Sequence, residues 1–443
     1  MKKPRHILIQ FCCMLTLLAT IMLQGFTKAV PAKPLWGFVE ELDSVPLSFD
    51  TYYDGSYQTY LTEKARRNTG FREFFIRNYN QVLYTCFHKI SNNNIEEGYD
   101  RECFLTMYLD EITGKTAESF FGNIWDLKTS AENNVQETLR LIDTLHQHGK
   151  EFLFVFAPTK TAVYAEKMPR YYQKRIADFS LEEYYIELFK ANNIPHIDLY
   201  HYFIDISDTV RYPLYTKFAS HWAESTIPMV ADTILRKLES ITNYKFPTIQ
   251  VSDSNITTDY SGYDQELEQT MNLLFPVPKP ALPRPVFDFK DTSGMDRPNL
   301  VIVGDSYFEQ LMFSCFKNTF NRWDYWQYML NVYSSRDHFK ELFTDVLDTP
   351  KTLQDADIVL AIFTAPNLYN YMYGFPNKAY EMLNDSDAEV LGMMEYIRRE
   401  PDWWNAVVEQ AEKRGIPVIE NLRQNAEYVI ATRKNQLSNP ENN

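Results

Sequence analysis

The pattern of apolar and polar positions predicts helices that alternate with short buried strands. Residues 133–148 carry apolar side chains three or four positions apart, the spacing of an amphipathic helix with one buried face. The run EFLFVFA at 151–157 follows and predicts a buried strand that ends at Pro158. A helix followed by a fully apolar strand is the repeating step of a parallel sheet that is covered on both faces.

The same alternation continues along the chain. The further elements expected from it are a helix at 181–191, a strand at 194–199, a helix at 224–238, a strand at 299–303, a helix at 307–316, a strand at 357–363 and helices at 403–414 and 419–432. Residues 275–298 contain six prolines. We expect a long connecting loop there, because proline fits neither a helix interior nor a central strand. The predicted fold class is therefore α/β, a parallel sheet flanked by helices, with a helical C-terminal tail.

The N-terminus combines basic residues at 1–6 with a mostly apolar run of 17 residues at 7–23. A cleaved signal peptide has an apolar run of about 7–15 residues and a membrane-spanning helix about 17–25, so this run lies at the boundary. We favour an uncleaved signal anchor helix, with cleavage after Ala29 as the alternative. In both cases we expect the rest of the chain in the periplasm, anchored in the cytoplasmic membrane or released from it.

The charge balance argues against nucleic acid as a partner. The chain has 44 Lys and Arg against 59 Asp and Glu, and four of the basic residues lie in the first 28 positions, which contain no acid. Nucleic-acid binding depends mainly on basic side chains at phosphates, which this acidic body does not offer. Glycine is scarce, and neither a dinucleotide-binding nor a P-loop glycine motif is present, so we expect no cofactor.

Three cysteines lie outside the apolar run, at Cys86, Cys103 and Cys315. Their odd number and the lack of a CxxC pair argue against a disulfide framework and a zinc ribbon, and we expect no metal site. A single Cys86–Cys103 disulfide and buried thiols both stay open as alternatives.

The strongest candidate for chemistry is the segment LVIVGDSYF, in which a buried strand runs into Gly304-Asp305-Ser306 and a helix follows at once. This geometry exposes the Ser306 hydroxyl at the carboxyl end of a parallel strand, where the sites of α/β proteins lie. Backbone N–H groups at the start of the helix suit an oxyanion, and Asp305 can accept hydrogen bonds from amides of the turn. The pattern is also typical of a serine that only caps a helix.

The best-placed base for such a serine is His221, in the segment FASHW just before a helix. Its neighbour Trp222 is a candidate to wall the site or to stack on a sugar ring, although a His-Trp pair is more often structural. A third segment, FAPTKTAVYAEKMP at 156–169, follows a buried strand and contains Lys160 and Tyr164. Lys160, at the strand end, is either a cation of the site or a solvated loop charge.

These three segments, in this order, resemble the alginate O-acetyltransferase family of the AlgX and AlgJ type. Its members are exported proteins with an SGNH-hydrolase-like domain, and the resemblance covers about residues 60–370. It implies that Ser306 is the nucleophile and His221 the general base. The candidates for supporting residues are Asp305, Lys160, Trp222 and Tyr164. Family members usually work beside a membrane-bound O-acyltransferase that passes acetyl groups across the membrane.

One position departs from the family pattern. The family has an acidic residue two positions before the histidine, and here that position is Ala219, which cannot orient an imidazole. Asp205, Asp208 and Glu224 are the nearby carboxylates that could take its place. Because loss of the orienting acid can cost about 10⁴-fold in a Ser-His-Asp triad, a Ser-His pair alone is expected to work more slowly.

The segments and the resemblance together suggest four regions and one function. The expected regions are a signal peptide or signal anchor at 1–29, a helical lead-in at 30–100, an SGNH-like acetyltransferase domain at 101–380 and a helical extension at 381–443. The expected function is transfer of acetyl groups to hydroxyls of a polysaccharide through an acetyl-serine, with the donor delivered by a membrane-bound O-acyltransferase. A carbohydrate acetyl-esterase and a non-catalytic glycan-binding or assembly subunit are the two alternatives.

Overall fold

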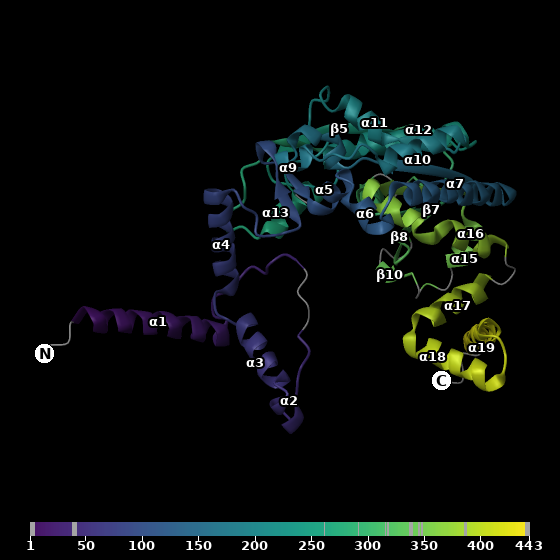
Figure 1. Ribbon diagram of the computed structural model, residues 1–443. Helices are drawn as coiled ribbons and strands as arrows, with labels where there is room; N and C mark the ends of the chain where they lie inside the picture. Colours follow the sequence, from purple (N-terminus) through teal and green to yellow (C-terminus); the bar gives the residue numbers. More distant parts are fainter. Residues whose placement is uncertain are drawn as a thin grey trace. The chain divides into compact units, whose positions relative to one another are not determined.

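The computed structural model in Figure 1 describes residues 5–37, 42–260, 262–290, 292–314, 316, 319–335, 340–343, 346, 349–384 and 388–438. The chain divides into two compact units, Met1–Glu97 with Gln265–Pro280, and Gly98–Asp264 with Ala281–Asn443. Residues 265–280 therefore group with the N-terminal part, although the sequence placed them inside the 101–380 domain. The other predicted boundaries stay predictions.

The first unit is mainly helical. Its elements are α1 (Arg5–Thr27), α2 (Phe49–Tyr53), α3 (Ser56–Arg67), α4 (Arg72–Phe87), β1 (Ile95–Glu97) and α13 (Glu266–Met271). Within α1, the 22-residue segment His6–Thr27 is mostly apolar, and none of it is buried. Their length and composition are sufficient for a helix that crosses a membrane, in agreement with a signal anchor or signal peptide.

The second unit contains a seven-stranded sheet in the order β10-β9-β8-β7-β11-β3-β4. The strands are β3 (Glu151–Ala157), β4 (His196–Asp198), β7 (Asn299–Gly304), β8 (Arg322–Gln327), β9 (Asn331–Ser334), β10 (Lys340–Leu342) and β11 (Ile358–Thr364). The five strands from β8 to β4 pair in parallel, which confirms the predicted parallel sheet, and β9 and β10 extend it in antiparallel fashion. β7 lies in the middle, between β8 and β11.

Helices cover both faces of this sheet (Figure 1). Their bounds are α5 (Thr106–Ile112), α6 (Lys115–Phe121), α7 (Ile124–Gln147), α8 (Lys160–Val163), α9 (Arg170–Gln173), α10 (Leu181–Ala191), α11 (Leu199–Ile206), α12 (Ile227–Ile241), α14 (Phe308–Ser314), α15 (Thr349–Asp355) and α16 (Phe375–Asn384). The phenylalanines of β3 pack into a core with α7, α10, α15 and α16, and the residues between them pack into a core with α5, α8, α11, α12 and α14. This period-two alternation between two apolar cores explains why the strand is apolar from Phe152 to Ala157.

The expected loop at 275–298 is wrong in part, because it contains the strand β6 (Leu282–Lys290). β6 pairs in antiparallel fashion with β5 (Thr248–Thr257) as a separate two-stranded ribbon. A strand in such a ribbon has an open edge, so Pro283 and Pro285 are tolerated there without a missing ladder hydrogen bond.

The chain ends in three helices with an apolar core of their own, as the predicted helical tail required. They are α17 (Ala388–Arg399), α18 (Pro401–Arg414) and α19 (Val418–Ser438), and the core includes Met393, Ile397 and Leu422. Cys86 is an exposed thiol and Cys103 a buried one, so the disulfide alternative is not realised, and Cys315 lies outside the described residues.

Candidate active site

Ser306 lies in the turn between β7 and α14, at the carboxyl end of the parallel strands. Gly304 packs so closely on β11 that a Cβ atom there would stand 2.7 Å from Ile362 Cγ2 and 2.8 Å from the Ile362 carbonyl oxygen. The absence of a side chain at Gly304 therefore allows β7 to end in a turn beside β11. Ser306 follows as a partly buried residue, and α14 begins at Phe308.

The Asp305 carboxylate holds this turn in place. One oxygen accepts the Tyr307 backbone N–H at 3.1 Å. The other accepts the Thr364 N–H, the Thr364 hydroxyl and the Asn367 side-chain amide, each at 2.7 Å. Burial raises the pKa of Asp305, and these hydrogen bonds oppose the shift. Asp305 thus ties the end of β7 to the end of β11, and its described contacts are all with the scaffold.

His221 contacts the Ser306 hydroxyl directly. Its Nε2 lies 2.9 Å from Ser306 Oγ, within hydrogen-bond distance, although the two residues are 85 positions apart in the chain. His221 is only 7% exposed. A serine hydroxyl paired with an imidazole at this distance has the geometry of a nucleophile with its general base.

Aromatic residues and Ser220 surround the His221 ring. The ring centroids of Tyr263 and Tyr307 each lie 4.8 Å from that of His221. The Tyr307 hydroxyl also donates to the Ser220 carbonyl oxygen at 2.6 Å, and Ser220 Oγ lies 3.4 Å from His221 Nδ1. Tyr307 comes directly after the candidate nucleophile, so it joins the turn of Ser306 to the loop of His221.

Three of the four predicted supporting residues, Lys160, Tyr164 and Trp222, are buried, and none presents its side chain to solvent. Trp222 is fully buried against Tyr307, with ring centroids 4.9 Å apart. It is therefore part of the core beneath the histidine and offers no face to a sugar. The Tyr164 hydroxyl accepts the backbone N–H of Leu214 at 3.0 Å, which fixes the start of the histidine loop.

Lys160 is neither a site cation nor a solvated charge. Its ammonium is 1% exposed and donates to the carbonyl oxygens of Cys103, Thr216 and Lys217 at 2.7 to 3.0 Å. It also lies 2.9 Å from the Glu102 carboxylate, which opposes the lowering of the Lys160 pKa by burial. Lys160 therefore holds the loop that leads to His221, and it acts through that loop.

We expect the Lys160→Met variant to lose about 3–5 kcal/mol of unfolding free energy. The substitution keeps the length of the side chain but leaves three carbonyl oxygens and the Glu102 carboxylate buried without their donor. Thermal and denaturant unfolding measure the loss. The matched control is Lys167→Met, because the Lys167 ammonium lies 3.6 Å from the same carboxylate but is 31% exposed, and should cost less than about 1 kcal/mol. Equal losses in the two variants would contradict this assignment.

Among the contacts given for the described residues, none joins His221 to the carboxylates considered as replacements for the missing acid. Asp205 at the end of α11 and Asp208 just after it are exposed, and neither makes a described contact with His221. The Glu224 carboxylate lies 3.8 Å from Arg284 Nε, and Ala219 itself is fully buried. Across the described residues, no group of three or more His, Cys, Asp or Glu is arranged to hold a metal ion.

Tyr328 is a residue of the site that the sequence did not single out. It follows β8, the neighbour of β7 in the sheet, and its hydroxyl accepts the Ser306 backbone N–H at 3.2 Å. Burial raises the pKa of Tyr328, so the phenol keeps its proton at neutral pH. Both Tyr328 and Met329 have a φ of 53°, in the left-handed region, where a non-glycine residue is strained by about 1–2 kcal/mol. Strained residues of this kind concentrate at functional sites.

A buried carboxyl on α5 makes the stability of this unit dependent on pH. Burial raises the pKa of Glu111 to about 7. Burial, and then Glu111, raise the pKa of the buried Glu182 as well. Because the unfolded chain releases the Glu111 proton near pH 4.5 and the folded chain keeps it until about pH 7, stability should fall as pH rises through this window.

Glu111→Gln is therefore expected to raise the unfolding free energy by about 3 kcal/mol at pH 8 and to change it little at pH 4. The amide keeps the shape of the protonated carboxyl but does not ionise. Unfolding curves recorded across this pH range measure the difference. Glu118→Gln, at an exposed position on α6, is the control and should leave the pH dependence as it is. A gain that is the same at both pH values would contradict the burial argument.

Residues 123–286 match the family model described as an SGNH hydrolase-like domain, acetyltransferase AlgX. The match includes His221 and the segment 156–169, and it ends before Ser306. It confirms the resemblance read from the sequence and the SGNH-like fold class.

Several solved structures are also similar to this chain. The O-acetyltransferase domain of Pseudomonas putida AlgJ is 15% identical, and the match covers 66% of this chain and 99% of that chain with a TM-score of 0.41. Pseudomonas aeruginosa AlgX is 14% identical over 66% of this chain and 68% of that chain, with a TM-score of 0.43. Bacillus cereus PatB1 is 13% identical over 56% and 92%, with a TM-score of 0.36. No curated protein matches this chain at a significant level.

Proposed function

We propose that this protein is an exported O-acetyltransferase that transfers an acetyl group to a hydroxyl of a polysaccharide through an acetyl ester on Ser306. The observation that carries the proposal is the 2.9 Å contact between His221 Nε2 and Ser306 Oγ at the carboxyl end of a central parallel strand. The match of residues 123–286 to an acetyltransferase family supports it.

The proposed reaction has two steps. In the first, His221 Nε2 takes the proton of Ser306 while Oγ attacks the acetyl carbonyl of the donor. A new C–O bond forms, the bond from the acetyl carbon to the leaving group breaks, and the leaving group takes the proton from His221. In the second, His221 takes the proton of a sugar hydroxyl, whose oxygen attacks the acetyl-serine. The acetyl group moves to the sugar, and Ser306 Oγ regains its proton.

Each step passes through a negatively charged tetrahedral oxygen that needs hydrogen-bond donors. In this proposal, the Ser306 N–H and the Tyr328 hydroxyl supply them. The Ser306 N–H donates to the Tyr328 hydroxyl at 3.2 Å, so both groups lie beside the nucleophile, and both would turn to donate to the oxygen when its charge develops. Donors fixed in advance at the developing charge are among the largest contributions to the rates of acyl transfer.

Tyr328→Phe is expected to lower the rate of acetyl transfer by about 10²-fold, because one oxyanion donor is lost while the ring stays in place. The measurement is the initial rate of ester formation on an oligosaccharide. Tyr333→Phe, on the adjacent strand β9, removes a hydroxyl outside the nucleophile turn and should change the rate by less than about threefold. Equal rates in the two variants would remove Tyr328 from the oxyanion site.

We also propose where the protein acts and where its acetyl group comes from. α1 anchors the chain in the cytoplasmic membrane, and the second unit acts in the periplasm. The donor is delivered by a membrane-bound O-acyltransferase, as the resemblance to the AlgX and AlgJ type suggests. The length and apolar composition of α1 support the anchor.

A transferase passes the acetyl group to a sugar hydroxyl, whereas an acetyl-esterase passes it to water, so the acceptor distinguishes the two functions. The purified chain is incubated with p-nitrophenyl acetate as the donor, with and without an oligosaccharide, and acetyl ester on the sugar is measured beside free acetate. Transfer predicts that the oligosaccharide takes most of the acetyl groups and suppresses hydrolysis. Release of acetate that the oligosaccharide does not affect would indicate the esterase, and the absence of both products would indicate a non-catalytic subunit.

A further inference from the structure

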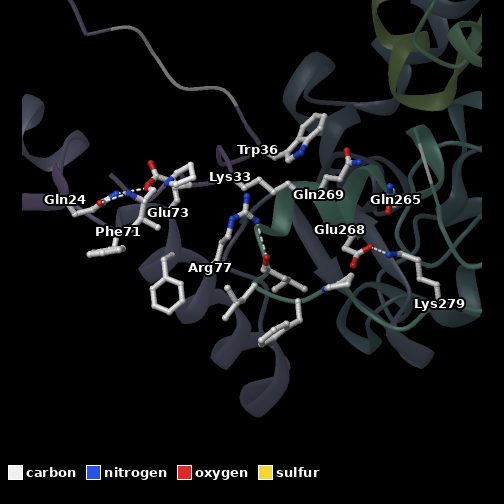
Figure 2. A pocket seen from close by; sticks show the side chains of 18 residues that line it. Gln24, Lys33, Trp36, Phe71, Glu73, Arg77, Gln265, Glu268, Gln269 and Lys279 are labelled. Carbon is white, nitrogen blue, oxygen red and sulfur yellow. Dashed lines mark hydrogen bonds and ion pairs between the residues drawn. The ribbon is translucent and has the colours of Figure 1, made fainter. Parts of the chain in front are cut away.

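A cavity in the first unit has no part in the proposed reaction. It has a volume of about 700 Å³ and is lined by the end of α1, the segment that follows it, α4 and residues of 265–279 (Figure 2). Its lining is mainly apolar, with a few charged side chains. Such a volume and composition are typical of a site for a small amphipathic molecule.

The end of α1 is built into this unit by two glycines. A Cβ on Gly70 would stand 2.1 Å from the Ile21 carbonyl oxygen, and one on Gly25 would stand 2.5 Å from the Asn68 carbonyl oxygen. The last turns of α1 therefore touch the turn between α3 and α4. The Gln24 side chain then bonds the backbone of Val30 at 2.7 and 3.0 Å, which turns the chain back after the helix.

This packing fixes the level of the cavity relative to a membrane that α1 crosses. The 22 residues of the apolar segment extend about 33 Å at about 1.5 Å per residue, close to the thickness of a bilayer's hydrocarbon core. Gln24 near the end of that segment and Val30 just after it are part of the cavity wall. The cavity therefore begins at the level of the phospholipid headgroups.

Charged side chains are spread along the cavity. Gln24 and Phe71 lie at one end, and Glu268 and Lys279 form an ion pair at the other (Figure 2). Arg77 lies between them, held by the carbonyl oxygens of Leu273 at 3.1 Å and Pro34 at 2.8 Å.

Lys33 and Phe74 are two exposed residues of the lining. Lys33 offers a second cation beside Arg77, and Phe74 presents an apolar face that is 49% exposed. Aromatic rings and two cations in the lining of one cavity match the acyl chains and the phosphate of a phospholipid.

We propose that this cavity binds a phospholipid of the membrane that α1 crosses, with its phosphate at Lys33 and Arg77 and its upper acyl chains against Phe71 and Phe74. The inference rests on the proposed membrane anchor and not on the reaction at Ser306. Its consequence is that the lead-in unit lies on the bilayer surface, where it would accompany a membrane-bound source of the acetyl group.

The test is photo-crosslinking of the full chain in nanodiscs of defined lipid. Benzoylphenylalanine replaces Phe74, which is 49% exposed, and in a second variant replaces Trp36, which is 54% exposed and also lines the cavity. Phe49 on α2 is the control position, because it is 82% exposed and does not line the cavity. We expect adducts of phospholipid mass at both cavity positions, at least about fivefold above the control.

A separate variant tests the proposed contact between the lipid phosphate and Lys33. In nanodiscs that contain phosphatidylglycerol, Lys33→Gln should reduce the adduct at Phe74 several-fold, while Lys89→Gln, an exposed lysine of the same unit, should not. The cavity assignment would be overturned if the anchored chain gave no lipid adduct above the Phe49 control. It would also be overturned if the crosslinks joined protein in place of lipid. Membrane fractions in which the protein begins at Val30 would instead overturn the anchor itself and leave the proposed reaction at Ser306 untouched.

Discussion

The Ser306→Ala variant should lose acetyl transfer almost completely, by at least about 10⁴-fold, while its unfolding temperature stays close to that of the wild type. The hydroxyl is the only group removed, and without it no acetyl ester can form at this position. The folded state should be little affected, since Ser306 is a partly buried turn residue and the fixed points of the turn are Gly304 and Asp305. Ester formation on an oligosaccharide and thermal unfolding are the two measurements.

The control for this variant is Ser207→Ala, at a partly buried serine directly after α11. It removes the same hydroxyl from the same unit, so it should leave transfer unchanged. A second readout is labelling by a fluorophosphonate, which reacts with activated serine hydroxyls. Wild type and Ser207→Ala should be labelled and Ser306→Ala should not. Transfer that persists in Ser306→Ala would contradict the assignment of the nucleophile.

His221→Gln is expected to reduce transfer by about 10²–10⁴-fold. Glutamine is close to histidine in size and can still hydrogen-bond Ser306 Oγ, but an amide does not accept a proton at neutral pH. The variant should therefore fold, because the packing against Tyr263 and Tyr307 is largely kept. Fluorophosphonate labelling of Ser306 should slow in parallel with transfer, since both reactions need the activated hydroxyl.

The matched control for the base is His201→Gln. His201 lies on α11 in the same unit and has a carboxylate partner, with Nδ1 2.8 Å from Asp198 Oδ2. A His-Asp pair without a serine beside it should have no role in transfer. If His201→Gln lowers the rate as much as His221→Gln does, the base has been placed on the wrong histidine.

The sequence was sufficient to predict the central part of the fold. The strands β3, β7 and β11 contain unbroken apolar runs at 152–157, 300–303 and 358–363, which a strand needs when both faces of its sheet are covered. The pairing of Ser306 with His221 was expected only from the order of the motifs, because nothing local to either residue reveals a contact across 85 positions.

The roles of Lys160 and Trp222 could not be predicted, because a sequence does not say which way a side chain points. A lysine at a strand end is ordinarily a site cation or a solvated charge, yet Lys160 is enclosed by carbonyl oxygens from segments 56 and 57 residues away. Trp222 follows the histidine immediately, and neighbouring residues of an extended loop point in opposite directions. Both side chains are buried, but His221 points to Ser306 and Trp222 packs against Tyr307.

Tyr328 and β6 were missed for a different reason. The strand before Tyr328, β8, contains Arg322, Asp324 and Gln327 among its aromatic residues, so it lacks the continuous apolar run that marks the other strands. The alternation of polar and aromatic residues in β8 is the signal that could have identified this strand, and with it Tyr328 at its end. β6 contains two prolines, which the rule for central strands excludes but an open two-stranded ribbon accepts.

The acetyl-serine at Ser306 is the central claim, and time-resolved peptide mass spectrometry tests it most directly. The wild-type chain is mixed with p-nitrophenyl acetate, quenched at short intervals and digested, and an oligosaccharide is then added to a parallel sample. We predict one acetyl group on the peptide that contains Ser306, which disappears when the oligosaccharide is added while the same amount of acetyl ester forms on the sugar. Acetylated sugar that forms while the Ser306 peptide stays unmodified at every time point would contradict the account.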